Sequence, residues 1–387
     1  RADALFFPDL SRGRAGVSDN NSVQDVYGLR AAIDTQMPDI GPATGNLVWG
    51  ADYDHETSRQ RGDQYRVNCL NYTKTGTTFE MGPDIATSTK AIFGQLSYDI
   101  DDWTLRGGVR REWIESEVSD SIAYGEIVQT GNRATLPGGT LKYDDTLYNL
   151  GAVYHLSENQ DVFVNFSQGF SLPDIQRFLR DVNSKYDIQN LNAQALKVDS
   201  YELGWRGNWD KWLASVTAYE NTSDVTQFYD ANDRVLRLIN QKERVRGVEP
   251  SLTYNFTDQW SVGGTYAYAK GETQQNGKWI DLPATRISPA KTTAFIGYDR
   301  GDYSLRLQGM RLADYDAAFK DNNGRDIKGY TLADLLGSVR LPVGRLEGAV
   351  YNLTNRNYQN MFAQANARAP YPNAEGRTFS LSYAVDW

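Results

Sequence analysis

The sequence predicts an all-β fold, a transmembrane antiparallel β-barrel, on three observations. The segment 377–387 alternates apolar with polar or small residues, as a strand between lipid and water does. The apolar residues are Phe379, Leu381, Tyr383, Val385 and Trp387, and those between them are Thr378, Ser380, Ser382, Ala384 and Asp386. Short and long connections alternate along the chain. The 387 residues include 24 Tyr, 14 Phe and 9 Trp, and aromatic girdles border membrane barrels.

Six short turn segments each separate two runs of period-two alternation, which is the pattern of β-hairpins. The turns are 99–102, 156–159, 207–210, 255–258, 299–302 and 341–344. The runs on either side of them, in the same order, are 91–98 and 103–113, 146–155 and 161–167, 201–206 and 212–219, 248–254 and 260–268, 292–298 and 303–311, and 331–340 and 345–352.

Longer polar stretches lie between these hairpins, at 57–85, 115–145, 168–197, 222–243, 271–288, 314–328 and 359–376. Outer-membrane barrels have this asymmetry, with tight periplasmic turns and long extracellular loops. We expect about sixteen strands, each crossing the bilayer with roughly ten residues. Little of the chain is left for a separate soluble domain, so 1–387 is expected to be one barrel portion.

Charged residues share the polar face of each run. Glu202 and Arg206 alternate with Tyr201 and Trp205. We expect this polar face to line the lumen, because an Arg at the lipid midplane would cost about 2–4 kcal/mol. His155 falls on the same face beside a turn, where a structural role is expected rather than a catalytic one.

Composition excludes several other classes of protein. No run of about 18 apolar residues is present, so no transmembrane helix is expected. The net charge of -9 argues against a nucleic-acid partner. The single cysteine, Cys69, is either a tolerated thiol or has its partner in sequence beyond this chain. The chain begins at Arg1 without an initiator Met or a signal peptide, and we expect it to be the later part of a larger protein.

Enzyme and metal signals are weak. The chain has two histidines and none of the GxSxG, HExxH, CxxC or phosphate-loop motifs. The Asp230 and Asp321 segments only partly match calcium loops, since both lack the closing bidentate Glu. We therefore expect no catalytic residues, no protein-bound metal and no cofactor.

Several segments, in this order, resemble the barrel of TonB-dependent outer-membrane receptors. They are Phe163–Pro173, the YELG run Tyr201–Arg206, the GVE run Val245–Glu249, the segment Tyr351–Tyr358 and Gly376–Phe379 with the aromatic end. Within the family, the chain is most similar to receptors for hydroxamate–citrate siderophores of the aerobactin kind. The segments that carry this similarity are 165–174, 197–206, 329–344 and 376–383. Thr354 and Trp387 depart from the family, which commonly has Phe at both positions.

This resemblance implies a 22-stranded barrel filled by an N-terminal plug, with a TonB-binding box ahead of the plug. The chain would supply about sixteen of these strands and would lack the plug. The implied function is outer-membrane uptake of a ferric siderophore with energy from TonB. Membrane lipid and lipopolysaccharide would surround the wall.

A ferric siderophore is often anionic and presents chelate oxygens, which suit guanidinium groups and aromatic faces. Residues of both types occur in the polar stretches. The candidate ligand-binding residues are Arg59, Arg61, Tyr65, Arg66, Arg177, Phe178, Arg180, Tyr186, Arg286, Tyr315, Phe362, Arg368 and Tyr371. Loop arginines of this kind also bind lipopolysaccharide phosphate or pair with Asp and Glu, and both alternatives stay open here.

Two other functions compete with siderophore uptake. A passive porin-like channel of about sixteen strands would need a loop folded into its pore and no plug. An outer-membrane lipase would need a Ser–His pair, which the sequence does not offer convincingly. The receptor motifs favour uptake over both.

Overall fold

The computed structural model describes residues 2–6, 17–68, 71–122, 134–180, 182, 188, 196–224, 226–230, 235–239, 241–284, 286–316, 326–365 and 373–385. Within these residues the chain is almost entirely β-strand. No helix in this part of the chain is long and apolar enough to cross a membrane.

One antiparallel sheet of 18 strands dominates the described residues. Two of its strands, β4 (Asn71–Glu80) and β17 (Lys278–Asp281), pair only with the end of one neighbour. The other sixteen form a wall in which each strand pairs with the next along the chain. The wall strands are β1 (Ala2–Phe6), β2 (Val17–Ile40), β3 (Ala43–Asn68), β5 (Ile85–Ile100), β6 (Trp103–Val118), β9 (Gly139–Ser157), β10 (Gln160–Ser171), β11 (Leu196–Asn208), β12 (Trp212–Ser223), β15 (Glu243–Asn255), β16 (Trp260–Gln275), β18 (Lys291–Asp299), β19 (Tyr303–Leu312), β20 (Tyr330–Arg340), β21 (Arg345–Tyr351) and β22 (Thr378–Ala384).

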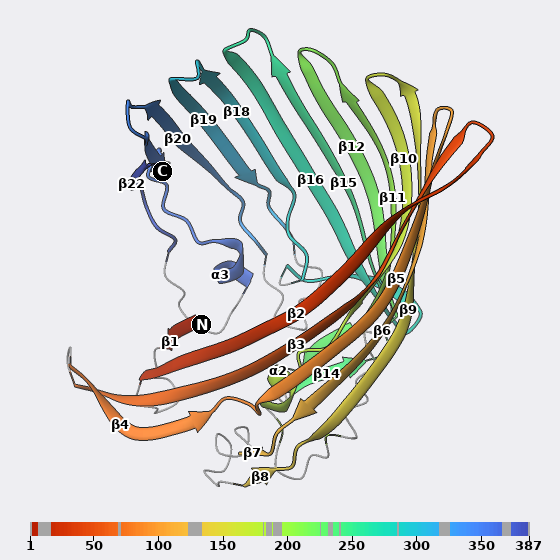
Figure 1. The fold of residues 1–387 in the computed structure, drawn as a ribbon. Helices are drawn as coiled ribbons and strands as arrows, with labels where there is room; N and C mark the ends of the chain where they lie inside the picture. The colour runs from red at the N-terminus through yellow and green to blue at the C-terminus, as the bar shows by residue number, and fades with distance from the viewer. Residues whose placement is uncertain are drawn as a thin grey trace.

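This up-and-down order confirms the predicted transmembrane-type antiparallel architecture and its strand number. The sheet curves as the wall of a barrel does (Figure 1). Among the described residues no pairing joins β1 to β22, so the wall is open. The short pairs β7 (Ser121–Ile122) with β8 (Thr135–Leu136) and β13 (Thr226–Asp230) with β14 (Val235–Ile239) lie outside the main sheet, as do helices α2 (Ile175–Arg180) and α3 (Met361–Ala365).

The wall has two different ends. At one end, which we call the turn end, hairpins close in a few residues, as at 101–102 between β5 and β6. The predicted short turns are confirmed at this end. The opposite end, which we call the loop end, holds α2, β7, β8 and β14 (Figure 1).

The predicted alternation of faces is confirmed. Residues in register across β9, β10 and β11 share a face, so Tyr154, Val162 and Trp205 lie on one face and His155, Asp161 and Arg206 lie on the other. On the inner face His155 Nδ1 lies 2.6 Å from an Asp161 carboxylate oxygen, and Arg206 Nε donates to the other oxygen at 2.7 Å. The charged groups therefore satisfy one another inside the wall, which explains why they are tolerated beside apolar outward residues.

A row of aromatic rings follows the turn end along five strands and the turn between two of them. Successive ring centroids lie 4.0 to 6.3 Å apart, from β12 to β19. The row consists of Trp212, Tyr254, Phe256, Trp260, Tyr298 and Tyr303. Amphipathic rings in this position are typical of the border between lipid tails and water.

The prediction of a loop is wrong for several of the long polar stretches, because strands continue into them. The stretch 57–85 was expected to be a loop, but β3 runs to Asn68 and β4 follows it back. Crossing a bilayer takes about ten residues, whereas β2 and β3 have 24 and 26. The outer part of β3, at 59–68, is mostly polar and lacks the apolar alternation on which the strand prediction relied.

Candidate ligand site at the loop end

An apolar cluster fills the inner face of the wall at the loop end. The outer parts of β6 and β9 contribute four inward side chains, and the α2 segment packs onto them. The buried members are Ile114, Val118, Leu136, Leu141, Tyr143, Ile175, Phe178, Leu179, Val182 and Ile188. Part of the long connection after β10 is therefore folded into the barrel, where it narrows the opening.

Local sequence explains why this segment turns inward as a short helix. Pro173 cannot continue the β10 ladder, and Asp174 then caps the helix, its Oδ1 accepting the Arg177 amide at 2.8 Å. Ile175, Phe178 and Leu179 share one helix face and supply the buried stripe. The same turn fixes the backbone of Arg177 in the first turn of the helix.

Side-chain bonds fasten the α2 segment to the β3–β4 hairpin. Gln176 Nε2 donates to the Pro83 carbonyl at 3.0 Å. Next to Pro83, both Asp84 carboxylate oxygens accept from Arg61, each at 2.8 Å. Arg61 also lies 3.5 Å from Glu80. A bidentate guanidinium of this kind is held in a fixed orientation.

A second buried cluster lies on the other side of the opening. It joins the connection after β17, the connection after β19 and helix α3. Its members are Ala284, Leu312, Ile327 and Ala365, packed against Met310, Tyr315, Tyr330 and Met361. The Tyr315 hydroxyl donates to the Leu282 carbonyl, and its backbone pairs with Ile327. Burial raises the pKa of the Tyr315 hydroxyl, so it stays protonated as a donor.

Two polar contacts hold this second group of loops together. The Gln364 amide of α3 bonds both main-chain groups of Lys328, accepting at 2.9 Å and donating at 3.1 Å. Arg286 pairs with Glu243 through both guanidinium NH2 groups, at 3.0 and 2.6 Å. These contacts tie α3 to the connection after β19, and the connection after β17 to strand β15.

Asn352 sets the path of the last long connection. Its backbone has φ +49°, its Oδ1 accepts the Arg356 amide at 2.8 Å, and its Nδ2 donates to the Arg356 carbonyl at 2.9 Å. Its own amide donates to Asp334 at 2.9 Å. Asn tolerates the left-handed region better than most residues. The Asn352 of the Tyr351–Tyr358 motif therefore has a structural role, which is to stabilise this turn.

The structure places the thirteen predicted ligand residues in several environments. Arg59, Arg61, Tyr65 and Arg66 lie on β3 rather than in a loop, which corrects that assignment. Phe178 is 8% exposed inside the first cluster, whereas Phe362 is 63% exposed on α3. The side chain of Arg180 and the residues Tyr186, Arg368 and Tyr371 lie outside the described part of the chain.

The loop end thus brings the predicted residues into two groups. Arg61, Arg177 and Phe178 belong to the group around α2, while Arg286, Tyr315 and Phe362 belong to the group around α3. Ligand contact by any of them stays a prediction. Sequence reasoning missed their supports, because the acidic partners Asp84 and Glu243 and the amide supports Gln176 and Gln364 carry no motif. Of the supports, only Asn352 was marked by a motif.

Charge chemistry at the loop end is organised as ion pairs. On the β3–β4 hairpin, the hydrogen bond from Lys74 holds the pKa of Asp63 below its usual value. Among the residues that the structure describes, no three His, Cys, Asp or Glu side chains are grouped to hold a metal ion. Guanidinium groups arranged in this way suit an anionic ligand.

The family model for the TonB dependent receptor-like β-barrel matches residues 2–353. The chain belongs to the TonB-dependent receptor family. This confirms the family predicted from the receptor motifs, and the homologues are transport receptors rather than enzymes.

Curated relatives match along nearly the whole chain. A ferric aerobactin receptor from Klebsiella pneumoniae is 32% identical over 98% of this chain and 55% of its own length. A rhizobactin receptor from Rhizobium meliloti is 28% identical over 97% of this chain and 54% of its own. This chain of the TonB-dependent receptor family therefore spans about half the length of the curated relatives it matches.

Solved structures share the fold. The copper transporter OprC has a TM-score of 0.72 at 18% identity, covering 94% of this chain and 57% of that one. The ferric citrate transporter FecA has a TM-score of 0.70 at 19% identity, covering 95% of this chain and 55% of that one. At these identities the agreement concerns the barrel wall of the receptor family and not the ligand.

Proposed function

We propose that the receptor containing this chain binds a ferric hydroxamate–citrate siderophore of the aerobactin kind and imports it with energy from TonB. One observation carries the proposal: the 32% identity to ferric aerobactin receptors extends over 98% of the chain. A rhizobactin receptor matches 97% of the chain at 28% identity. TonB and the rest of the binding site would involve the parts of the receptor beyond this chain.

The loop end offers chemistry that suits such a ligand. Arg61 and Arg286 are held bidentate by Asp84 and Glu243, so each guanidinium already has the geometry that binds a carboxylate. A ligand carboxylate would replace the protein carboxylate at these positions. The guanidinium stays paired through this exchange and water solvates the displaced carboxylate, so the exchange itself is close to neutral in free energy.

The proposed setting is the bacterial outer membrane. An outward aliphatic belt, which includes the exposed Leu105, Leu203 and Leu305, would contact lipid together with the row of rings, and lipopolysaccharide would surround the loop end. The inner face, with pairs such as Arg206 with Asp161, would provide a polar path. No nucleic-acid partner and no catalytic step are proposed.

The test is ligand binding by the full-length receptor. Binding of ferric aerobactin and of a ferric catecholate would be measured by the quenching of intrinsic fluorescence, and iron uptake would be measured with and without TonB. We expect aerobactin binding and TonB-dependent uptake. Arg286→Ala is expected to weaken binding about tenfold, which is about 1.4 kcal/mol.

Arg300→Ala serves as the matched control, because Arg300 lies at the turn end, far from the opening. If the receptor bound the ferric catecholate more tightly than ferric aerobactin, the hydroxamate–citrate ligand class would be rejected, while siderophore uptake would remain the function. Iron uptake that persists without TonB, with passage of unrelated small solutes, would favour the porin-like alternative.

A further inference from the structure

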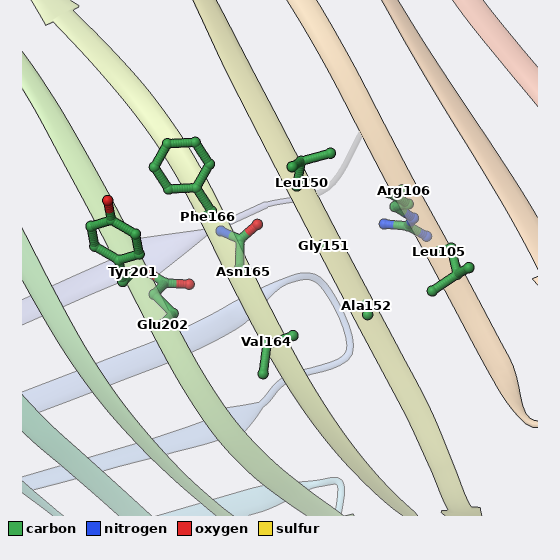
Figure 2. A pocket seen from close by; sticks show the side chains of 10 residues that line it. All are labelled: Leu105, Arg106, Leu150, Gly151, Ala152, Val164, Asn165, Phe166, Tyr201 and Glu202. Atoms are coloured by element: carbon green, nitrogen blue, oxygen red, sulfur yellow. The ribbon is translucent and has the colours of Figure 1, made fainter.

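A hollow opens on the outer face of the wall, across strands β6, β9, β10 and β11. Its volume is about 530 Å³. Figure 2 shows the side chains around it, and the lining residues are Leu105, Arg106, Leu150, Gly151, Ala152, Val164, Asn165, Phe166, Tyr201 and Glu202. It lies well away from the loop-end site described above.

The hollow faces outward and is apolar. Leu150 is 60% exposed, Val164 50% and Tyr201 48%. They share the outward face with the ring of Trp103, which stacks near Tyr154 with centroids 4.7 Å apart. The charged side chains of Arg106 and Glu202 lie behind the strands, toward the lumen (Figure 2).

The register explains why the wall is hollowed here. Ala152 lies between Leu105 on β6 and Val164 on β10, so a small side chain stands between two larger ones. One step toward the loop end, Phe166 and Tyr201 pair with ring centroids 5.1 Å apart and form one side. The result is a depression in the outer face, bordered by Leu105, Val164 and the Phe166–Tyr201 pair.

The position of the hollow along the strands indicates which membrane leaflet it would face. Leu105 follows Trp103 by two residues, which is about 7 Å along a strand. Trp103 and Tyr154 mark the membrane border at the turn end, and short turns face the periplasm in outer-membrane barrels. The hollow therefore starts just inside the periplasmic border of a hydrocarbon core about 30 Å thick.

We propose that this hollow is a seat for one acyl chain of an inner-leaflet phospholipid, which is retained longer than the surrounding lipid. The inference rests on the proposed outer-membrane location. It follows from continuity with the outward aliphatic belt, from the apolar lining and from the depth. An empty depression would lose its dispersion contacts, and a flexible chain restores them.

The experiment uses the full-length receptor in vesicles of phosphatidylethanolamine that carries a photoactivatable diazirine on its acyl chain. After illumination, crosslinked peptides are mapped by mass spectrometry. We expect crosslinks concentrated at Leu150, Ala152 and Val164 compared with outward residues of β12. Ala152→Phe, which fills the hollow, should lower the local yield at least about threefold.

Ala218→Phe is the matched control, because Ala218 is an exposed outward residue of β12 that does not line the hollow. It should leave the yield at the hollow unchanged. If the crosslinking yield were uniform over all outward faces, the retained acyl chain would be rejected, while the membrane placement would stand. Absence of acyl crosslinks anywhere on the wall would overturn both. Correct folding of each variant is checked by ferric-siderophore binding, since neither residue lies at the loop end.

Discussion

Two tyrosines at the loop end, the buried Tyr143 and the half-buried Tyr315, differ in what their hydroxyls contact. Within the described residues the Tyr143 hydroxyl has no hydrogen-bond partner, whereas the Tyr315 hydroxyl donates to the Leu282 carbonyl. Tyr143→Phe is expected to keep or raise local stability, by up to about 1–2 kcal/mol, because it removes an unsatisfied buried group. Tyr315→Phe should lower local stability by about 1 kcal/mol. Amide hydrogen exchange around each residue measures both, and equal effects would contradict the assignment.

Tyr143 is expected to make the stability of the folded protein depend on alkaline pH. Burial raises the pKa of Tyr143 to about 12 from its ordinary value of 10.0. The folded protein therefore keeps a proton that the unfolded chain releases, so this contribution is complete below pH 10 and is lost between about pH 10 and 12. The loss is at most about 2–3 kcal/mol. Tyr143→Phe should flatten this part of the stability–pH curve measured by urea unfolding, and an unchanged slope would reject the assignment.

At the scale of elements, Asn352 controls the connection between β21 and β22. Asn352→Ala removes three side-chain hydrogen bonds and places Ala at φ +49°, so we expect local destabilisation of about 2–4 kcal/mol. Asn352→Gly keeps the backbone angle and should cost less. Cleavage of the connection by added protease measures the difference. Equal cleavage of the two variants would show that the angle is unimportant.

Elements with a membrane face were predictable, and those beyond it were not. The alternation on β22 and the short turn at 101–102 follow from period-two patterning with turn residues. The β3–β4 hairpin was missed because its strands are mostly polar and carry no apolar alternation. Helix α2 has six residues, too few for a helical period to show. The site residues on these elements were recognised by type, but their salt-bridge partners depend on pairing between distant segments.

At the scale of the whole molecule, the row of rings is expected to fix the depth of the barrel in the membrane. Trp260 lies within this row, 4.9 Å from Tyr298 and 6.1 Å from Phe256. Trp260→Ala should slow folding of the receptor into lipid vesicles severalfold, because an interfacial anchor and two ring contacts of about 0.5–1.5 kcal/mol each are lost.

Trp279 provides the matched control for this prediction. It is similarly exposed, 37% against 39% for Trp260, but it lies on β17 at the loop end with the Arg244 guanidinium 4.0 Å above its ring. Trp279→Ala removes an indole of the same size without touching the turn-end border. Folding followed by the shift of the heat-modifiable band on gels should therefore slow for Trp260→Ala alone. Equal slowing by both variants would mean that lost hydrophobic area, and not position in the row, limits insertion.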